Sequence, residues 1–360
     1  MSYIVHDKYK ESFLHLIPVF ITIIIAQKTE LINSLWACVS AYIVYKKTFQ
    51  LSVEKACLRI VGTVFGALLG YSIASLFVPN KLIVCILVFI FTIYSIYNNN
   101  TTNYGYALVY FSMTIFIVLS RSIHELPTDL KNYVIIRIFS VLFGSCIALI
   151  FNSIFGRISE TKEFFIKIKD FKNIEHYFYE GLIIEDKEYK SDLIFYCLCG
   201  AVALSTTVLF NPNANSEIFF QSGTSILFIM ILPFKTIKDK GINAMYTRIL
   251  HRLAGALIGA CIGMICFLVV KSNSLLFYPA IIVSIFACIL VNYTEKYSYI
   301  GLQTFLGYSS VMFPKPMYNY TYIQIFTRFI GVFEGVLVLL CCIFILSLFR
   351  NLYRKSFKTT

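Results

Sequence analysis

The sequence predicts an all-α, polytopic membrane protein with about twelve transmembrane helices, arranged as two parallel six-helix repeats. Three observations predict this fold class. Apolar residues make up 58% of the 360 residues and charged residues only 14%, whereas a soluble domain is nearer a quarter charged. Apolar runs long enough to span a bilayer recur along nearly the whole chain. A pattern of arginine followed by regularly spaced glycines occurs in both halves at matched positions.

Twelve apolar runs are the expected spans, and turn-forming stretches such as VPNK and NPNANSE separate them. The first two runs are short for complete spans, so we expect them to be tilted or re-entrant. The expected spans cover residues 12–27, 31–45, 57–78, 82–98, 104–120, 132–155, 191–210, 217–233, 247–270, 275–292, 298–314 and 322–349.

These spans divide the chain into a first six-helix repeat (1–156), a linker (157–190), a second six-helix repeat (191–349) and a basic tail (350–360). In the linker, apolar side chains recur at helical spacing with lysines between them. This pattern predicts an amphipathic helix on the inner membrane surface, and a regulatory or partner-binding role is the alternative.

The distribution of positive charge predicts the orientation in the membrane. The chain carries a formal net charge of +12, and most lysines and arginines lie in the loops on one side. By the positive-inside rule, this side is the cytoplasm, which places both termini there. Because the charge is confined to short loops and no basic domain exists, we expect no nucleic-acid partner.

An internal repeat relates the two halves. A shift of 193 residues places Arg59, Gly62, Gly66 and Gly70 on Arg252, Gly255, Gly259 and Gly263. The same shift also matches polar loop residues, including Asn80 with Asn273 and Tyr104 with Tyr297. Six spans per half is an even number, so both halves enter the membrane in the same direction. We therefore expect a pseudo-twofold axis along the membrane normal, with a substrate path at the repeat interface.

A second arginine pattern occurs at the sixth span of each half. A shift of 191 residues places Arg137, Ser140 and Gly144 on Arg328, Gly331 and Gly335. Small residues four apart let two helix backbones approach closely in lipid, where hydrophobic burial does not drive pairing. We therefore expect all these glycines to lie in helix-packing faces, with the two longer glycine faces meeting a neighbour within a half or across the axis.

The four arginines share the small-residue faces of their helices, so they should point at protein rather than at lipid. Arg59 and Arg252 lie at cytoplasmic span ends, where extension to the lipid headgroups is the alternative role. Arg137 and Arg328 lie on the outer side, against the charge bias, and buried cations usually face a cavity or a partner. Together, Arg59, Arg137, Arg252 and Arg328 predict a substrate-binding path for anions.

Glu334 is the acid deep within an expected span, and Phe143 is its counterpart in the first half. An intramembrane acid acts as a counter-ion or a proton carrier. We expect Glu334 on the cavity side, paired with Arg137 across the pseudo-axis, because Arg328 lies about 240° away around the same helix. For Trp36, the single tryptophan, we expect a packing or interface role, with Phe219 as its aromatic near-equivalent.

Catalytic and metal-binding patterns are absent from the sequence. There is no nucleophile motif, zinc motif, carboxylate pair or phosphate-binding loop. The eleven cysteines and five histidines lack metal-site spacing. The sequence therefore predicts a protein that is not an enzyme and has no cofactor and no metal.

The stretches RIVGTVFGALLG and RLAGALIGACIG, each preceded by two spans and a basic loop, resemble the membrane domain of the fusaric acid resistance and aromatic acid exporter superfamily. More remotely, they are similar to the plant aluminium-activated malate transporters, which pair two six-span subunits around an anion path. The resemblance covers both halves. It implies a bacterial inner membrane, efflux of aromatic or other organic acids, and family motif positions at Arg59 and Arg252.

Two departures from that superfamily bear on partners. Larger exporters carry sizeable soluble domains, whereas this chain has a linker of about 35 residues. Its short outer loops offer little surface for a periplasmic adaptor, which argues against adaptor-linked efflux. The expected partners are membrane lipid and a small organic anion.

Three functions remain open at this stage: an exporter or uniporter of organic anions, a passive anion channel, and a non-transporting membrane scaffold. The sequence leaves the substrate, the coupling ion and the oligomeric state undetermined.

Overall fold

The computed structural model describes residues 2–76, 80–123, 127–155, 187–210, 216–241, 243–272, 274–294, 296–313 and 322–356. Throughout these ranges, the regular elements are helices, and none is a strand. The helices before the linker are α1 (Ser2–Gln27), α2 (Ser34–Val44), α3 (Phe49–Leu76), α4 (Lys81–Thr101), α5 (Gly105–Ser122) and α6 (Pro127–Phe155). Those after it are α9 (Lys187–Phe210), α10 (Ser216–Met230), α11 (Phe234–Lys240), α12 (Asn243–Ser272), the 3₁₀ turn η1 (Ser274–Leu276), α13 (Phe277–Asn292), α14 (Ser298–Met312) and α15 (Tyr322–Ser356).

A helix lies at each of the twelve expected spans, and α11 is an additional short one. Within the described residues, however, eight helices are long and apolar enough to cross a membrane, or nine if α10 and α11 form one broken span. The axes of α10 and α11 differ by 62°. The expected linker helix within 157–190 lies outside the described residues, except that 187–190 begin α9. Helix α15 also continues beyond the expected boundary at 349, to Ser356.

The first two expected spans differ from each other in length. The first is not short, because the polar start of the chain continues the helix, and Lys8–Gln27 alone is long enough to cross. Helix α2 has 11 residues, about 16 Å at 1.5 Å per residue, which is roughly half of a ~30 Å hydrocarbon core. The side chain of Asn33 caps α2 by accepting the backbone N–H of Leu35 at 3.0 Å, which satisfies a donor that the helix leaves unpaired.

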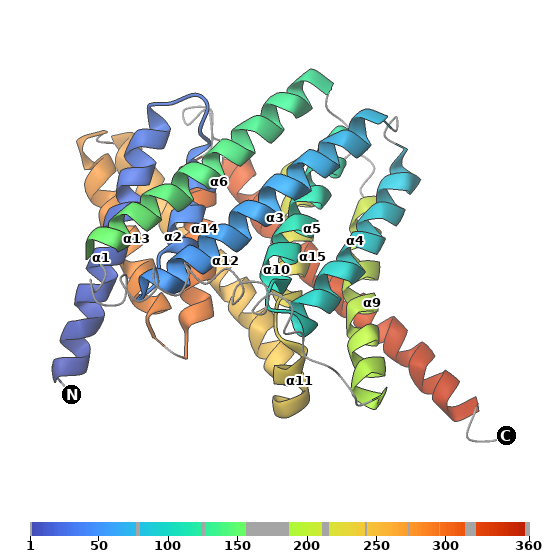
Figure 1. Cartoon of the computed structure of the whole chain (residues 1–360). Helices are drawn as coiled ribbons and strands as arrows, with labels where there is room; N and C mark the ends of the chain where they lie inside the picture. Colours follow the sequence, from blue (N-terminus) through green and yellow to red (C-terminus); the bar gives the residue numbers. More distant parts are fainter. Residues whose placement is uncertain are drawn as a thin grey trace, which may run out of the picture.

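The helices before and after the linker pack in matching pairs. Before it, α3 packs on α5 and α2 on α6, and after it, α12 packs on α14 and α10 on α15. The main contacts between the two sets are α4 against α9 and α1 against α13, and smaller ones join α5 to α10 and α2 to α14. In Figure 1, α3 and α6 run side by side across the front of the view, and α1 begins and α15 ends at its lower edge.

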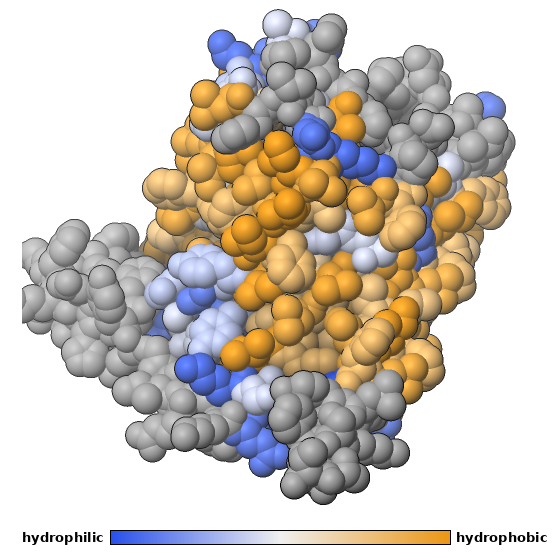
Figure 2. All heavy atoms as spheres, turned by 90° about the vertical axis from the view of Figure 1, so that its right-hand side faces the viewer, coloured by the Kyte–Doolittle hydropathy of each residue, from blue (hydrophilic) through white to orange (hydrophobic). Residues whose placement is uncertain are grey.

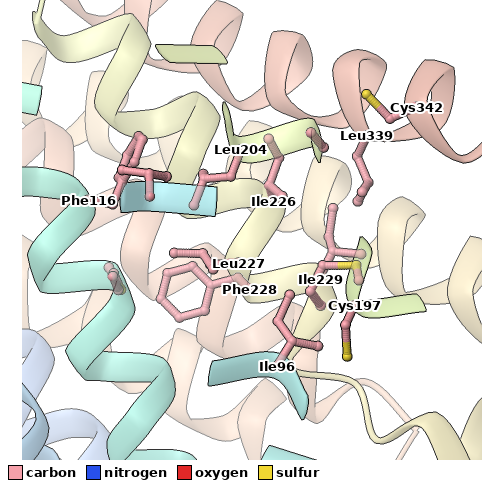
Figure 3. Close-up of a cluster of buried hydrophobic side chains, with 14 of the residues drawn as sticks. Ile96, Phe116, Cys197, Leu204, Ile226, Leu227, Phe228, Ile229, Leu339 and Cys342 are labelled. Carbon is pink, nitrogen blue, oxygen red and sulfur yellow. The ribbon is translucent and has the colours of Figure 1, made fainter. Parts of the chain in front are cut away.

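The apolar residues lie in two kinds of place in this fold, in buried clusters and on the outer surface of the helices. The largest buried cluster combines residues from both sides of the linker, including Phe116 of α5, Leu204 of α9, Phe228 of α10 and Leu339 of α15, as Figure 3 shows. Other large apolar side chains point outward from α3, α4, α6, α12 and α15. Figure 2 shows such residues covering the middle of one face. Apolar burial and an apolar outer surface together are what a membrane protein requires.

Candidate functional site

Arg59 of α3 is buried, with 2% of its surface exposed. Its Nε donates a hydrogen bond to Ser40 Oγ of α2 at 3.1 Å. Its guanidinium carbon lies 4.4 Å from the ring centre of Tyr110 on α5, which is a cation–π contact. The Nη1 atom of Arg59 is buried, and no described residue accepts a hydrogen bond from it. Three helices therefore hold a buried cation with spare capacity to donate.

Arg252 of α12 is equally buried, at 3% exposure, but its hydrogen bonding is denser. Its Nε and Nη2 both donate to Ser225 Oγ of α10, at 3.3 and 3.0 Å. Its Nη1 donates to Gln303 Oε1 of α14. The ring of Phe228 lies 5.1 Å from the guanidinium carbon.

The partners of these two arginines occupy matching positions. The shift of 193 residues that relates Arg59 to Arg252 also relates Tyr110 to Gln303. Ser40 lies on α2 and Ser225 on α10, and each donates its hydroxyl to the carbonyl four residues earlier. Each serine is thereby oriented to accept from an arginine.

A cavity of about 40 Å³ lies between these two arginines. Residues of α2, α3 and α5 form one side and residues of α10, α12 and α14 the other, so helices from both sides of the linker enclose it. Its wall is mostly apolar and aromatic, and it contains Trp36, Tyr110, Phe220 and Phe228 as well as Arg59 and Arg252.

Arg328 lies in an adjoining cavity of about 30 Å³. Helices α10, α12, α14 and α15 enclose this second cavity, and Gln221, Arg252 and Ser310 line both cavities. Arg328 itself is 7% exposed. The structure therefore brings Arg252 and Arg328 to the same cavity.

Arg137 of α6 is 2% exposed and stands behind the wall of the first cavity. Its guanidinium carbon lies 4.0 Å from the Trp36 ring centre, and its Nη1 donates to Tyr133 Oη at 3.5 Å. Arg137 is not a lining residue of either cavity. It reaches the site through Trp36, whose ring it stacks on.

Comparison with known families identifies the chain. The sequence pattern of the family described as fusaric acid resistance protein-like matches residues 21–151 and 220–342. The chain belongs to this family. Its members are membrane transporters rather than enzymes. None of the curated proteins and none of the solved structures matches the chain.

In this fusaric acid resistance-like protein, Glu334 does not take the expected place. It is half-exposed on α15, beside the outward-facing Ile330 and Leu337, and it lines neither cavity. Where side chains are described, no ion pair joins Glu334 to Arg137. The expected pairing of Glu334 with Arg137 is wrong. Around α15, the roughly 240° between Arg328 and Glu334 is about 120° by the shorter way, so the rotation that points Arg328 inward points Glu334 away from the cavities.

The glycine faces of the protein meet neighbours within their own half. Gly62, Gly66 and Gly70 face α5, and Gly255, Gly259 and Gly263 face α14. A Cβ on Gly66 would stand 2.6 Å from the Phe111 carbonyl oxygen. Gly144 faces α2 at Ala37, and Gly335 faces α10 at Ser222. Close backbone approach thus positions α3 and α12, and with them Arg59 and Arg252.

Sequence reasoning did not find most partners of the arginines. Ser40, Ser225, Tyr110 and Gln303 were overlooked because small, aromatic and amide residues inside apolar runs are common. The shift of 193 residues contained the signal for Tyr110 and Gln303, because it aligns them one turn beyond Tyr106 and Tyr299. For Trp36, packing points to Gln221 rather than Phe219 as the counterpart, since Gly144 meets Ala37 and Gly335 meets Ser222, the residues that follow.

Proposed function

We propose that this protein exports small organic acid anions, aromatic ones included, across a bacterial inner membrane through the space between two six-helix repeats. The observation that carries the proposal is the cavity shared by Arg59 and Arg252. Two buried cations in an apolar interior require compensating charge. The described lining of both cavities contains no carboxylate, so an anion from solution is the natural counter-charge.

The two-repeat arrangement, with repeats at 1–156 and 191–349, is part of the proposal. The matched packing of α3 on α5 and α12 on α14 supports it. So does the family pattern, which matches one stretch before the linker and one after it. A pseudo-twofold axis along the membrane normal would bring Arg59 and Arg252 to equivalent places on the two sides of the cavity.

We assign the chain ends to the cytoplasmic side. The basic stretches at 46–55 and 235–240 support this orientation by the positive-inside rule, and the start of α1 and the end of α15, which both lie at the lower edge of Figure 1, agree with it. On this assignment, Arg59 and Arg252 lie toward the cytoplasmic ends of α3 and α12, and the anion enters from the cytoplasm.

The size of the cavity requires movement during transport. One water molecule needs about 10–15 Å³ of cavity volume. The cavity of about 40 Å³ therefore holds about three waters and is too small for an aromatic acid. Larger anions require the two sides to separate. The contacts of α5 with α10 and of α2 with α14 are where this separation would occur. Helices α2 and α10 take part in these contacts and carry the serines that accept from the arginines.

A passive anion pathway is the second candidate, and one observation favours it. The acid expected to carry protons, Glu334, lies away from both cavities. A scaffold without transport is less well supported, because all four arginines are buried in protein rather than extended to headgroups.

The test is anion flux into lipid vesicles that contain the purified protein. We expect uptake of benzoate and propionate above that of protein-free vesicles, with strong loss in the double variant Arg59→Gln/Arg252→Gln. Lys131→Gln removes one exposed charge from α6 and should transport normally. Uptake that follows the anion gradient without dependence on a proton gradient supports the passive pathway. Wild-type uptake no faster than that of protein-free vesicles contradicts both candidates.

A further inference from the structure

We propose that the two matched arginines have different roles, with Arg59 binding the carboxylate of a monocarboxylic acid and Arg252 acting as a positioning residue. The inference rests on the proposed function and goes beyond it, because the repeat alone predicts two equal anion sites. The structure distinguishes the two arginines by one matched pair of residues, Tyr110 and Gln303.

Arg252 is held on both edges of its guanidinium plane. Ser225 accepts from Nε and Nη2, and Gln303 accepts from Nη1. A carboxylate binds arginine best through two parallel N–H donors on one edge of the plane. For Arg252, either edge is available only after one of these bonds breaks. Its fixed charge nevertheless contributes positive potential to the cavity.

Arg59 is held less densely: its Nε donates to Ser40 Oγ, and the Tyr106 hydroxyl lies close to it. Its Nη1 is buried without a partner among the residues that the structure describes, although buried donors in proteins are nearly always paired. Tyr110 offers Arg59 a ring face where Gln303 offers Arg252 an oxygen. A ring face attracts the cation and leaves the N–H donors in the guanidinium plane available. Arg59 is therefore poised to donate to an incoming carboxylate.

The surroundings of Arg59 also indicate what the carboxylate is attached to. Trp36, Phe220 and Phe228 line the cavity beside it, which suits a small apolar body. A second carboxylate would have to compete with Gln303 for Arg252. The amide Nε2 of Gln303 has no partner either, but it is neutral, and a neutral donor binds an anion less strongly than a charged one. The favoured ligand is therefore a monoanion with an apolar side.

The experiment measures binding of propionate and succinate to the purified full chain. Trp36 is the single tryptophan and lines the cavity, so its fluorescence reports occupancy, and ligand-induced thermal stabilisation gives an independent measurement. We expect propionate to bind more tightly than succinate. Arg59→Gln should weaken propionate binding at least about tenfold, and Arg252→Gln by less than about threefold. Lys131→Gln is the matched charge control and should bind as the wild type does.

A further variant protects the test against misfolding of Arg59→Gln. Tyr110→Gln keeps the arginine but gives it the partner that Arg252 has, so it should also weaken propionate binding several-fold, with Arg59→Lys intermediate. Equal losses from Arg59→Gln and Arg252→Gln in folded protein, or tighter binding of succinate, overturn the division of roles while leaving transport intact. Failure of the wild type to bind either acid contradicts the proposed function itself.

Discussion

The surroundings of Arg59 and Arg252 differ, although the helices that carry them repeat the same pattern. Each arginine is followed by three glycines that meet a neighbouring helix, and each donates to a serine on a short helix. The difference is Tyr110 beside Arg59 and Gln303 beside Arg252. The repeated arginine and glycine pattern therefore places a cation at each position. The residue opposite the arginine determines how many of its N–H donors remain available.

The other arginine pair shows the same difference. Arg137 stacks on the Trp36 ring, whereas Arg328 shares its cavity with Gln221, the counterpart of Trp36. In both cases, the half before the linker offers an aromatic face and the half after it offers an amide. Amides therefore stand near Arg252 and Arg328 where aromatic rings stand near Arg59 and Arg137.

The largest expected effect is a loss of stability when a glycine of either packing face is replaced, because both halves depend on this close helix contact. Gly66→Leu and Gly259→Leu should each cost at least about 3 kcal/mol of stability, because a branched side chain enters a backbone contact. The nearest atoms are the carbonyl oxygens of Phe111 and Thr304. Thermal unfolding in detergent measures the loss. Val61→Leu, on the outward-facing side of α3, is the control and should be neutral. Wild-type stability of both glycine variants would contradict close packing.

The next largest effect is a difference in the stability lost when each matched arginine is replaced by methionine. Arg252→Met leaves Ser225 and Gln303 buried without their donor, and we expect a loss of about 3 kcal/mol. Arg59→Met removes one hydrogen bond and one ring contact, so the loss should be about 1–2 kcal/mol. Chemical unfolding of the two purified variants under identical conditions gives the comparison. A larger loss in Arg59→Met would reverse the assignment of the more firmly held arginine.

Giving Arg252 the aromatic partner that Arg59 has should reduce the difference in anion binding between the two arginines. Gln303→Tyr replaces the oxygen that accepts from Arg252 Nη1, so the second arginine becomes available and we expect succinate to bind several-fold more tightly than to the wild type. Tryptophan fluorescence titration measures the change, with circular dichroism to show that the fold survives. Unchanged succinate binding in a folded Gln303→Tyr protein would mean that another feature restrains Arg252.

The smallest expected effect is the loss of stability when Trp36, whose ring contacts Arg137, is replaced by phenylalanine. Trp36→Phe keeps an aromatic face for Arg137 but a weaker one, so stability should fall by about 1 kcal/mol or less from the cation–π contact, with a further contribution from the lost ring volume. Because this substitution removes the single tryptophan, thermal unfolding followed by circular dichroism is the measurement. A gain in stability would show that the Arg137 contact is unfavourable.

Much of the architecture could be predicted because its causes are local. The positions of the helices follow from the lengths of apolar runs and from the turn residues between them. The inward direction of Arg59 and Arg252 follows from the glycines three and seven residues later, which share a helix face with them. Span length could not be predicted in this way: α2, α10, α13 and α14 are helical as expected, but each is shorter than a span.

The sequence by itself determined that this is a helical membrane protein, that an arginine and glycine pattern occurs in both halves, and that the glycines form packing faces. Only the tertiary structure decided that those faces meet α5 and α14 rather than each other, and that Tyr110 and Gln303 face the arginines. It also decided that Glu334 turns away from the cavities. The physical reason is that periodicity along one helix defines a face, whereas the partner of that face depends on how separate helices rotate and pack against one another.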